Sequence, residues 1–338
     1  MNFIILGAGA IGCYVGGRLA LAGENVMLVG RPRVIEPLAL HGLTVSDLDG
    51  YEGHLEAVNL RLATSLADAM ASIVLSQPTV ILLCVKGGAT EAAAREIAQA
   101  CPAGTPIVSL QNGVYNLARI QSAAPQMPVL AGMVPYNVVM ASPHHPHRAS
   151  TGSLHIARHA LSEQMLPALV AAGLPTELVD DMRTVQWGKL LLNLNNPVNA
   201  LSDLPLRAQL MDRDYRRVLA DLQTEALAAM AAAGIRPAKV AAAPPRALPH
   251  LLRLPNWLFT RLAARMLRID ASARSSMWDD VQHGRVTEID DLCGAVVRLA
   301  QAHGTRAPLN AAMCQLILRH RQGQAMSGSQ IRRALNQL

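Results

Sequence analysis

A glycine-rich turn near the start of the chain is the feature that most constrains its fold. The turn reads Gly7-Ala8-Gly9-Ala10-Ile11-Gly12; it directly follows the apolar run 2–6 and opens an Ala-rich helical segment. In such a strand–turn–helix unit the first glycine permits the tight turn, the second lets a pyrophosphate approach the backbone, and the third lets the helix pack closely. The spacing therefore predicts a dinucleotide site. The alternative, a glycine-rich turn that only allows tight packing, leaves the spacing of the glycines unexplained.

Further apolar runs in the first half indicate a parallel sheet. The runs 25–29, 79–85 and 107–110 lack the polar alternation of a one-sided sheet, so they are predicted to be strands buried on both faces. With the helical segments 10–22 and 89–100 between them, they predict an α/β fold with an N-terminal Rossmann-type doubly wound sheet.

The next apolar runs are expected to finish this sheet or to pair antiparallel at its edge. They are 129–140 and 153–157, predicted to be strands joined by the loop 141–152.

Beyond Asp180-Asp181 the pattern changes to long helical periodicities. We therefore expect two domains, residues 1–180 with the NADP site and residues 181–338 as an all-helical substrate and catalytic domain. The segment 234–255 is rich in proline and must include a loop or a broken helix. The predicted helices are 182–200, 212–233, 248–267, 287–303 and 309–321.

Residues that follow the predicted strands indicate which dinucleotide binds. After the second strand stands Arg31, where an NAD site usually has an Asp or Glu that accepts from the ribose hydroxyls. Arg31 cannot accept, but it can pair with a 2′-phosphate, which favours NADPH/NADP; a solvated loop charge is the alternative. Lys86 and Asn112 follow the next two predicted strands, at the edge where ligands bind to an open α/β sheet.

A cluster of asparagines in the predicted helix 182–200 is unusual, because Asn is a poor helix former. At about 100° per residue, Lys189, Asn193 and Asn196 fall within an arc of about 60°, so one face presents an amine and two carboxamides. Pro197 is expected to kink the helix at Asn196. A solvated polar face is the alternative, although such faces are usually richer in Glu, Lys and Arg.

A second polar cluster spans 275–290 and includes Ser276 and Asp280. Thr287 and Asp290 have the spacing of a capping box, and an acidic Glu288 in the first turn would favour the helix dipole. Glu288 is therefore either a structural residue or part of a site, and the local sequence leaves both readings open.

Taken in order along the chain, these motifs resemble the ketopantoate reductases, that is the 2-dehydropantoate 2-reductases. The resemblance covers residues 1 to about 320. The glycine turn is shared by many dehydrogenases, but Lys-x-x-x-Asn on a helix followed by Ser-Ser-Met and Thr-Glu-Ile-Asp is far more specific. The resemblance implies an NADPH-dependent enzyme of pantothenate biosynthesis that reduces the keto group of a 2-oxo acid.

The resemblance also implies roles for individual residues. Lys189 would be the catalytic lysine and Glu288 the acidic active-site residue. The expected substrate contacts are Asn193, Asn196, Ser276 and Asp280, and the expected cofactor contacts are Gly7, Ala8, Gly9, Ala10, Ile11, Gly12, Arg31, Lys86 and Asn112. One departure concerns Asn196, which stands three residues after Asn193, where the family commonly has four.

Composition narrows the choice among function classes. A formal net charge of +6 is compatible with binding to nucleic acid, to a membrane surface or to a small anion. The basic residues are dispersed, apart from an enrichment at Arg319, Arg321, Arg332 and Arg333, and no recognition motif accompanies them, so we expect neither nucleic acid nor membrane as a partner. A homodimer stays open. The five scattered cysteines favour a reducing cytoplasm.

Other classes of protein find less support in the sequence. The loop His144-His145-Pro146-His147 lacks the ligand spacing of a zinc site, so no metal is expected. No G-x-S-x-G motif of a serine hydrolase occurs. Two alternatives remain: a reductase of another 2-oxo acid with the same architecture, and a protein that senses NADPH without turnover, which would be expected to lack the lysine or the acid.

Overall fold

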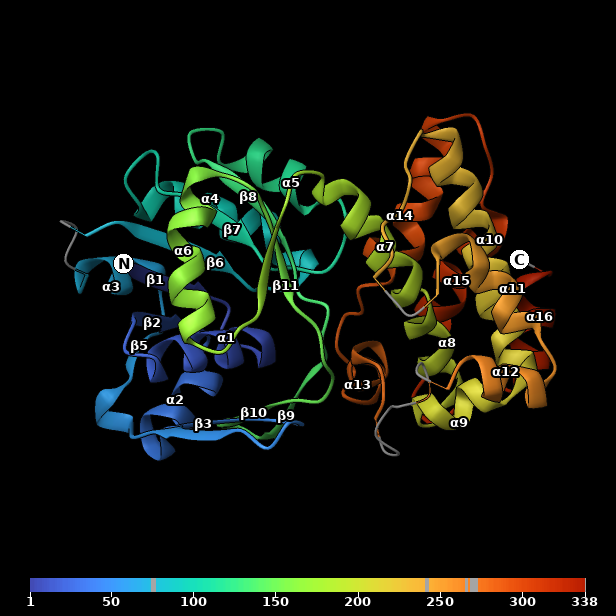
Figure 1. The fold of residues 1–338 in the computed structure, drawn as a ribbon, viewed down its shortest axis with the longest axis horizontal. Coiled ribbons are helices and arrows are strands. Elements are labelled where there is room, and N and C mark those ends of the chain that lie inside the picture. Colours follow the sequence, from blue (N-terminus) through green and yellow to red (C-terminus); the bar gives the residue numbers. More distant parts are fainter. Residues whose placement is uncertain (74–76, 241–242, 265–266, 268–272, 338) are drawn as a thin grey trace. The chain divides into compact units, whose positions relative to one another are not determined.

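The computed structural model describes residues 1–73, 77–240, 243–264, 267 and 273–337 (Figure 1). Within it the chain forms two compact units, Met1–Met182 and Arg183–Leu338. The first contains the strands of the structure and the second consists of helices and connecting loops. The chain is therefore an α/β protein with an N-terminal sheet and a C-terminal helical region, which confirms the predicted fold class.

The first unit is built on a sheet of eight strands in the order β12-β11-β8-β7-β6-β1-β2-β5. The six strands from β5 to β8 are all parallel and have the Rossmann order 3-2-1-4-5-6. β11 pairs antiparallel with β8 and parallel with β12. The strands are β1 (Asn2–Leu6), β2 (Asn25–Val29), β5 (Arg61–Ala63), β6 (Thr79–Leu83), β7 (Ile107–Ser109), β8 (Val129–Met133), β11 (Leu154–Ala157) and β12 (Thr176–Val179).

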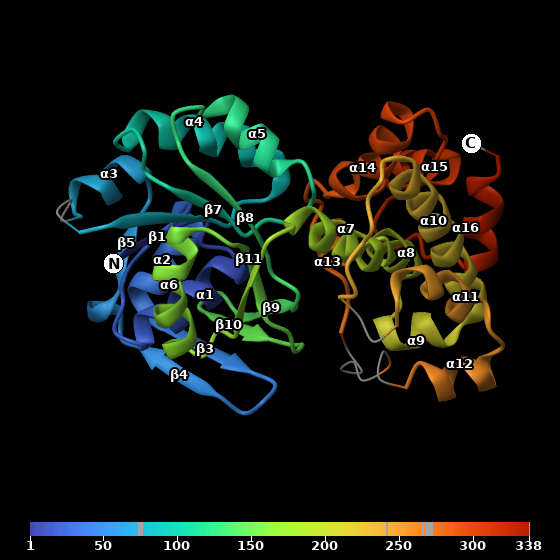
Figure 2. The ribbon, with the colours of Figure 1, turned by 45° about the horizontal axis from the view of Figure 1, so that its top comes forward.

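Helices cover both faces of this sheet (Figure 2). Alternate residues of β1 point to opposite sides: Phe3 and Ile5 join one apolar cluster, while Ile4 and Leu6 join the other. The strands are apolar without alternation because both of their faces are buried. The first cluster includes residues of α1 (Ala10–Leu21), α2 (Pro32–His41) and α6 (Ala160–Ala171); the second includes residues of α3 (Leu66–Ala71), α4 (Thr90–Ala100) and α5 (Asn116–Ala123).

A second, four-stranded sheet packs against α1 on the side away from β1. Its order is β4-β3-β10-β9, with β3 (Leu43–Asp47), β4 (Glu52–Leu55), β9 (Val138–Ser142) and β10 (His145–Arg148). Asp47 joins the two layers, because its carboxylate pairs with Arg18 of α1 at 3.3 Å and with Arg148 of β10 at 3.1 Å.

This second sheet corrects two predictions. The expected strand 129–140 is divided between β8 and β9, since Pro135 lies between them and cannot donate to a sheet ladder. The expected loop 141–152 contains β10, in which His145 and His147 hydrogen-bond the Ser46 hydroxyl at 2.7 and 2.8 Å. In the described part of the chain, no group of three or more His, Cys, Asp or Glu is arranged to hold a metal ion.

The helical unit is organised around α10, which packs against α8, α9, α11, α14, α15 and α16. α8 in turn packs against α13. The helices are α7 (Met182–Asn193), α8 (Asn195–Ser202), α9 (Leu206–Met211), α10 (Arg213–Ala232), α11 (Leu248–Arg253), α12 (Asn256–Leu262), α13 (Ser276–Gln282), α14 (Ile289–Ala302), α15 (Pro308–Arg319) and α16 (Gly328–Leu335). Three short 3₁₀ turns are η1 (Ala57–Asn59), η2 (Gly87–Ala89) and η3 (Pro245–Ala247).

Prolines divide two of the predicted helices. The helix 182–200 ends at Asn193 and resumes at Asn195, so the kink expected at Asn196 lies earlier. The reason is that the ring of Pro197 clashes with the carbonyl four residues before it, which is that of Asn193. The predicted helix 248–267 is likewise broken before Pro255, between α11 and α12; its residues 265–266 lie outside the described part of the chain.

None of the helices in the described part of the chain has the length and apolar character needed to span a bilayer.

Candidate functional site

The glycine turn lies at the carboxyl end of β1, beside the end of β2. The amides of Gly7 and Ala8 both donate to the Val29 carbonyl at 3.0 Å, and Gly7 has a φ of +108°, which favours glycine. A Cβ added at Gly12 would overlap the Gly7 carbonyl oxygen, so the helix can approach the turn only without a side chain there. Gly9 differs from both, because a Cβ there would meet no atom within 4 Å.

The turn presents the amino end of α1 to an incoming group. Gly9 is the N-cap residue and offers no side chain to cap the helix, and the first turn of α1 contains no acidic residue. The first amides of a helix and its dipole together attract negative charge. A turn with backbone open at Gly9 and a helix start without acidic residues fits the pyrophosphate of a dinucleotide.

The structure brings three further predicted cofactor contacts to this edge of the sheet. Arg31 is exposed and is the N-cap residue of α2, directly after β2; Lys86 is exposed after β6; Asn112 is partly buried after β7. Adjacent strands align at these ends, since Leu6 pairs in register with both Val29 and Leu83. Four consecutive strand ends thus contribute residues to one edge, at the position where doubly wound sheets bind ligands.

Gln111 braces this edge, a role that the sequence did not indicate. Its side-chain amide donates to the Val85 carbonyl and to the Thr90 hydroxyl, each at 2.8 Å. Its side-chain oxygen accepts from the Ser109 hydroxyl at 3.0 Å. The buried Gln111 thereby ties the segments after β6 and β7 together and fixes the loops that contain Lys86 and Asn112.

In the helical unit, Lys189 and Asn193 lie one turn apart on α7, and both are partly buried. Burial disfavours the charged ammonium and lowers the pKa of Lys189 to about 8, although the nearby carboxylate of Glu288 acts in the opposite direction. An amine with a pKa close to neutral can hold or release a proton under ordinary conditions. This is the property expected of a general acid or base.

The capping box expected from Thr287 and Asp290 does not form at the start of α14. The N-cap residue is Glu288, which makes no side-chain cap, so the capping-box interpretation is wrong, although the Glu288 carboxylate still lies at the positive end of the helix dipole. The helix begins at Ile289 rather than at Thr287. Glu288 is partly buried, and its charge acts on Lys189.

Asn196 lies in the first turn of α8, so Lys189, Asn193 and Asn196 do not share one face of a continuous helix as predicted. The backbone of Asn196 contacts α13 instead: its carbonyl accepts a hydrogen bond from the Ser275 hydroxyl at 3.3 Å. Ser275 also caps α13 by accepting from the Trp278 amide at 3.1 Å. The neighbouring Ser276 is exposed at the first position of that helix.

Asp280 is placed differently from the other expected substrate contacts. It is buried on α13, and its carboxylate accepts from Arg285 at 3.1 Å, while its carbonyl accepts the Arg285 amide at 2.8 Å. These bonds hold the loop between α13 and α14, which ends at Glu288. Asp280 therefore positions this loop, and its expected contact with substrate stays a prediction.

A buried amide network beneath these residues was missed in the sequence. Asn199 is fully buried; its side-chain oxygen accepts from the Ser275 amide at 2.9 Å and its NH2 donates to the Leu204 carbonyl at 2.9 Å. Gln209 exchanges two hydrogen bonds with Asn195, at 2.8 and 3.2 Å. The unusual density of Asn in this segment thus serves in part to join α8 to α9 and α13.

Replacing Asn199 with alanine should destabilise the helical unit, because the Ser275 amide and the Leu204 carbonyl lose their buried partner. Each buried group left unsatisfied costs about 1–3 kcal/mol. The free energy of unfolding from urea titration should fall by an amount of that order. The matched control is Asn336→Ala, on an exposed residue that follows α16. Equal stability of the two variants would contradict this role for Asn199.

Comparison with known proteins connects the two units to one family. The family model "Ketopantoate reductase PanE/ApbA" matches residues 3–160, and the model of the C-terminal part of the same family matches residues 181–321. A 2-dehydropantoate 2-reductase of Pyrococcus horikoshii is 28% identical over 327 residues, which cover 94% of this chain and 96% of that protein. One of Halobacterium salinarum is also 28% identical, over 94% of this chain and 98% of its own length.

Solved structures agree with these matches. A PanE/ApbA family ketopantoate reductase of Ralstonia eutropha superimposes with a TM-score of 0.78 and 28% identity, over 94% of this chain and 97% of that one. A D-mandelate dehydrogenase with NADH and anilino(oxo)acetate has a TM-score of 0.74 at 19% identity, over 100% of this chain and 99% of that one, and it therefore shares the fold. The chain belongs to the ketopantoate reductase PanE/ApbA family of oxidoreductases, as its motifs predicted.

Proposed function

We propose that this protein reduces 2-dehydropantoate to pantoate with NADPH. The observation that most supports the proposal is the lowered pKa of Lys189. This partly buried amine on α7 has a pKa of about 8 and interacts electrostatically with Glu288. A keto group that becomes an alkoxide needs a proton and a nearby positive charge, and an ammonium of this kind can supply both. Membership of the family agrees with this chemistry.

In the proposal, the residues of the first unit hold the cofactor. The amino end of α1 faces the pyrophosphate, with the backbone at Gly9 open to it, and Arg31 pairs with the 2′-phosphate. Lys86 and Asn112 contribute from the neighbouring strand ends. When bound, the cofactor supplies the hydride.

The residues of the helical unit act on the substrate. Lys189 donates a proton to the keto oxygen and stabilises the negative charge that develops there, while Glu288 keeps the lysine protonated by its charge. Asn193, Asn196 and Ser276 hold the carboxylate and hydroxyl of the acid, and their hydrogen bonds orient the keto carbon.

The direct test measures the rate of NADPH oxidation with each member of a panel of 2-oxo acids. We expect 2-dehydropantoate to give the highest kcat/KM among 2-dehydropantoate, pyruvate, 2-oxoisovalerate and oxaloacetate. Lys189→Ala should lower kcat by about 10²–10⁴-fold, the usual contribution of a general acid, without loss of NADPH binding. Preference for a different 2-oxo acid would reassign the substrate, and near-normal turnover of the variant would remove the role of Lys189.

The pH profile tests the pairing of Lys189 with Glu288. Reduction requires the protonated lysine, so kcat should fall as the pH rises through about 8, the pKa of Lys189. The carboxylate of Glu288 raises that pKa against the effect of burial, so Glu288→Gln should move the falling limb to lower pH.

Asp290→Asn is the matched control for this pH shift. Asp290 is an exposed acid two positions along the same helix start, and its carboxylate pairs with Arg298 at 2.8 Å. The control variant should keep the pH profile of the original protein. A limb that moves equally in both variants, or in neither, would contradict a specific effect of Glu288.

Cofactor preference provides a separate test. Arg31→Ala should raise the KM for NADPH by about tenfold or more, as expected when a charge-assisted pair worth about 1.5–3 kcal/mol is lost. The KM for NADH should stay nearly constant, because NADH has no 2′-phosphate for Arg31 to bind. Equal changes for both cofactors would show that Arg31 acts on something other than the phosphate.

The second candidate function is reduction of a different 2-oxo acid. It is favoured by one comparison: a protein of the same fold is a D-mandelate dehydrogenase that binds NADH and anilino(oxo)acetate. The aromatic acid phenylglyoxylate, added to the panel with NADH and NADPH in parallel, distinguishes this candidate from the first.

A further inference from the structure

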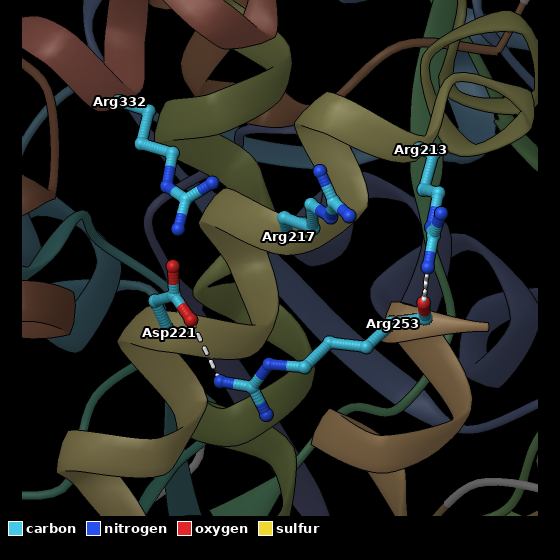
Figure 3. Close-up of a pocket in the computed structure, with 5 residues that line it drawn as sticks. All are labelled: Arg213, Arg217, Asp221, Arg253 and Arg332. Atoms are coloured by element: carbon cyan, nitrogen blue, oxygen red, sulfur yellow. Dashed lines mark hydrogen bonds and ion pairs between the residues drawn. The ribbon is translucent and has the colours of Figure 1, made fainter. Parts of the chain in front are cut away.

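A cavity in the helical unit is lined mainly by arginines, and its residues lie outside the elements that contain Lys189, Ser276 and Glu288. It has a volume of about 310 Å³ and is lined by Arg213, Arg217, Asp221, Arg253 and Arg332. These residues come from α10, from the end of α11 and from α16; in Figure 3, Arg332 and Arg253 extend towards Asp221, while Arg213 extends to the backbone of Arg253. Four guanidinium groups and one carboxylate leave the lining with a strong positive excess.

Part of this arrangement has a structural explanation. Arg253 donates to the Asp221 carboxylate at 2.6 Å, and Arg213 donates through two nitrogens to the Arg253 carbonyl at 3.0 and 3.1 Å. These bonds attach the end of α11 to α10. The carboxylate of Asp221 neutralises the charge of Arg253. The other three guanidinium groups of the lining have no carboxylate partner within the lining.

The remaining two arginines are not accounted for by packing. Among the described residues, Arg217 forms an ion pair with Asp214 at 3.6 Å on the surface, where such a pair contributes little. Arg332 is exposed on α16, and within the described residues it forms no ion pair with any carboxylate. Figure 3 shows Arg332 and Arg253 on opposite sides of Asp221.

A buried cation interacts electrostatically with Arg213, one of the arginines that line the cavity. Arg216 of α10 is fully buried, and its hydrogen bonds go to neutral oxygens, including the Leu252 carbonyl at 3.0 Å and the Asn256 side chain at 2.8 Å. Its guanidinium also lies over the Phe259 ring at 4.1 Å. Because arginine stays charged in proteins, this charge persists beneath the same helix.

We propose that this cavity binds a small anion with several charges, of the diphosphate or triphosphate type. Planar guanidinium groups bind phosphate oxygens through two parallel hydrogen bonds, and gathering several like charges without a ligand is unfavourable. The volume is at the lower end of the roughly 300–1,000 Å³ of small-molecule sites, which fits a compact group. This inference is independent of the proposed reaction.

Calorimetric titration with inorganic pyrophosphate tests the site. We expect the original protein to bind pyrophosphate, Arg332→Gln to bind about tenfold more weakly, and Arg217→Gln/Arg332→Gln to bind more weakly still, as expected when charge-assisted hydrogen bonds are lost. The matched control is Arg333→Gln, an exposed arginine on the same helix that is not part of the lining, and it should bind as the original protein does.

Two further measurements separate the outcomes. Thermal unfolding should show the double variant to be at least as stable as the original protein without ligand, since repulsion between arginines is removed, and binding should weaken with salt. Absence of binding by the original protein would overturn the proposal. So would unchanged binding by the folded double variant, which would place pyrophosphate elsewhere, for example at the Gly7–Gly12 turn, or an equal loss in Arg333→Gln.

Discussion

Close packing of α1 between two sheets is the constraint on which the first unit depends. A Cβ at Gly12 would overlap the turn, one at Gly16 would lie 2.6 Å from Leu28, and one at Gly17 would lie 2.7 Å from Val45 of the second sheet. Glycine within a helix costs about 1 kcal/mol relative to alanine, so three such residues in one helix are explained only by this contact. The same closeness brings the amino end of α1 against the strand ends where Arg31, Lys86 and Asn112 lie.

Buried polar contacts have the corresponding role in the helical unit. Asn199, Ser275 and the carbonyl of Asn196 join α8 to α13, and Asp280 with Arg285 fixes the loop towards Glu288. The break at Leu194 separates Lys189 and Asn193 from Asn196, so these side chains come from two consecutive helices. Because a helix interruption changes which groups can meet, Pro197 affects the site although its own side chain has no chemistry.

The sequence predicted best what depends on local pattern. The runs 2–6 and 25–29 match β1 and β2, and the predicted helix 212–233 matches α10 to within a residue at each end, because burial on both faces and helical periodicity are visible in a single segment. It failed where distant segments decide the outcome. Residues 145–148 form a strand where a loop was expected, because they pair with the neighbouring strand 138–142 and, at 147 and 148, with the distant strand 43–47. The buried contacts of Gln111 and Asn199 likewise depend on partners outside their own segments.

Arg18, Arg216 and Lys189, three of the buried or partly buried cations among the described residues, are held in different ways, and the differences indicate which of the three can take part in proton transfer. Arg18 is neutralised by Asp47, and Arg216 is surrounded by carbonyls and an amide oxygen. Neither guanidinium can release a proton under physiological conditions. At Lys189, burial lowers the pKa of the amine and the charge of Glu288 raises it, and the net result is a pKa of about 8. A small change in the surroundings of Lys189 therefore changes its protonation, whereas the same change at Arg18 or Arg216 alters only stability.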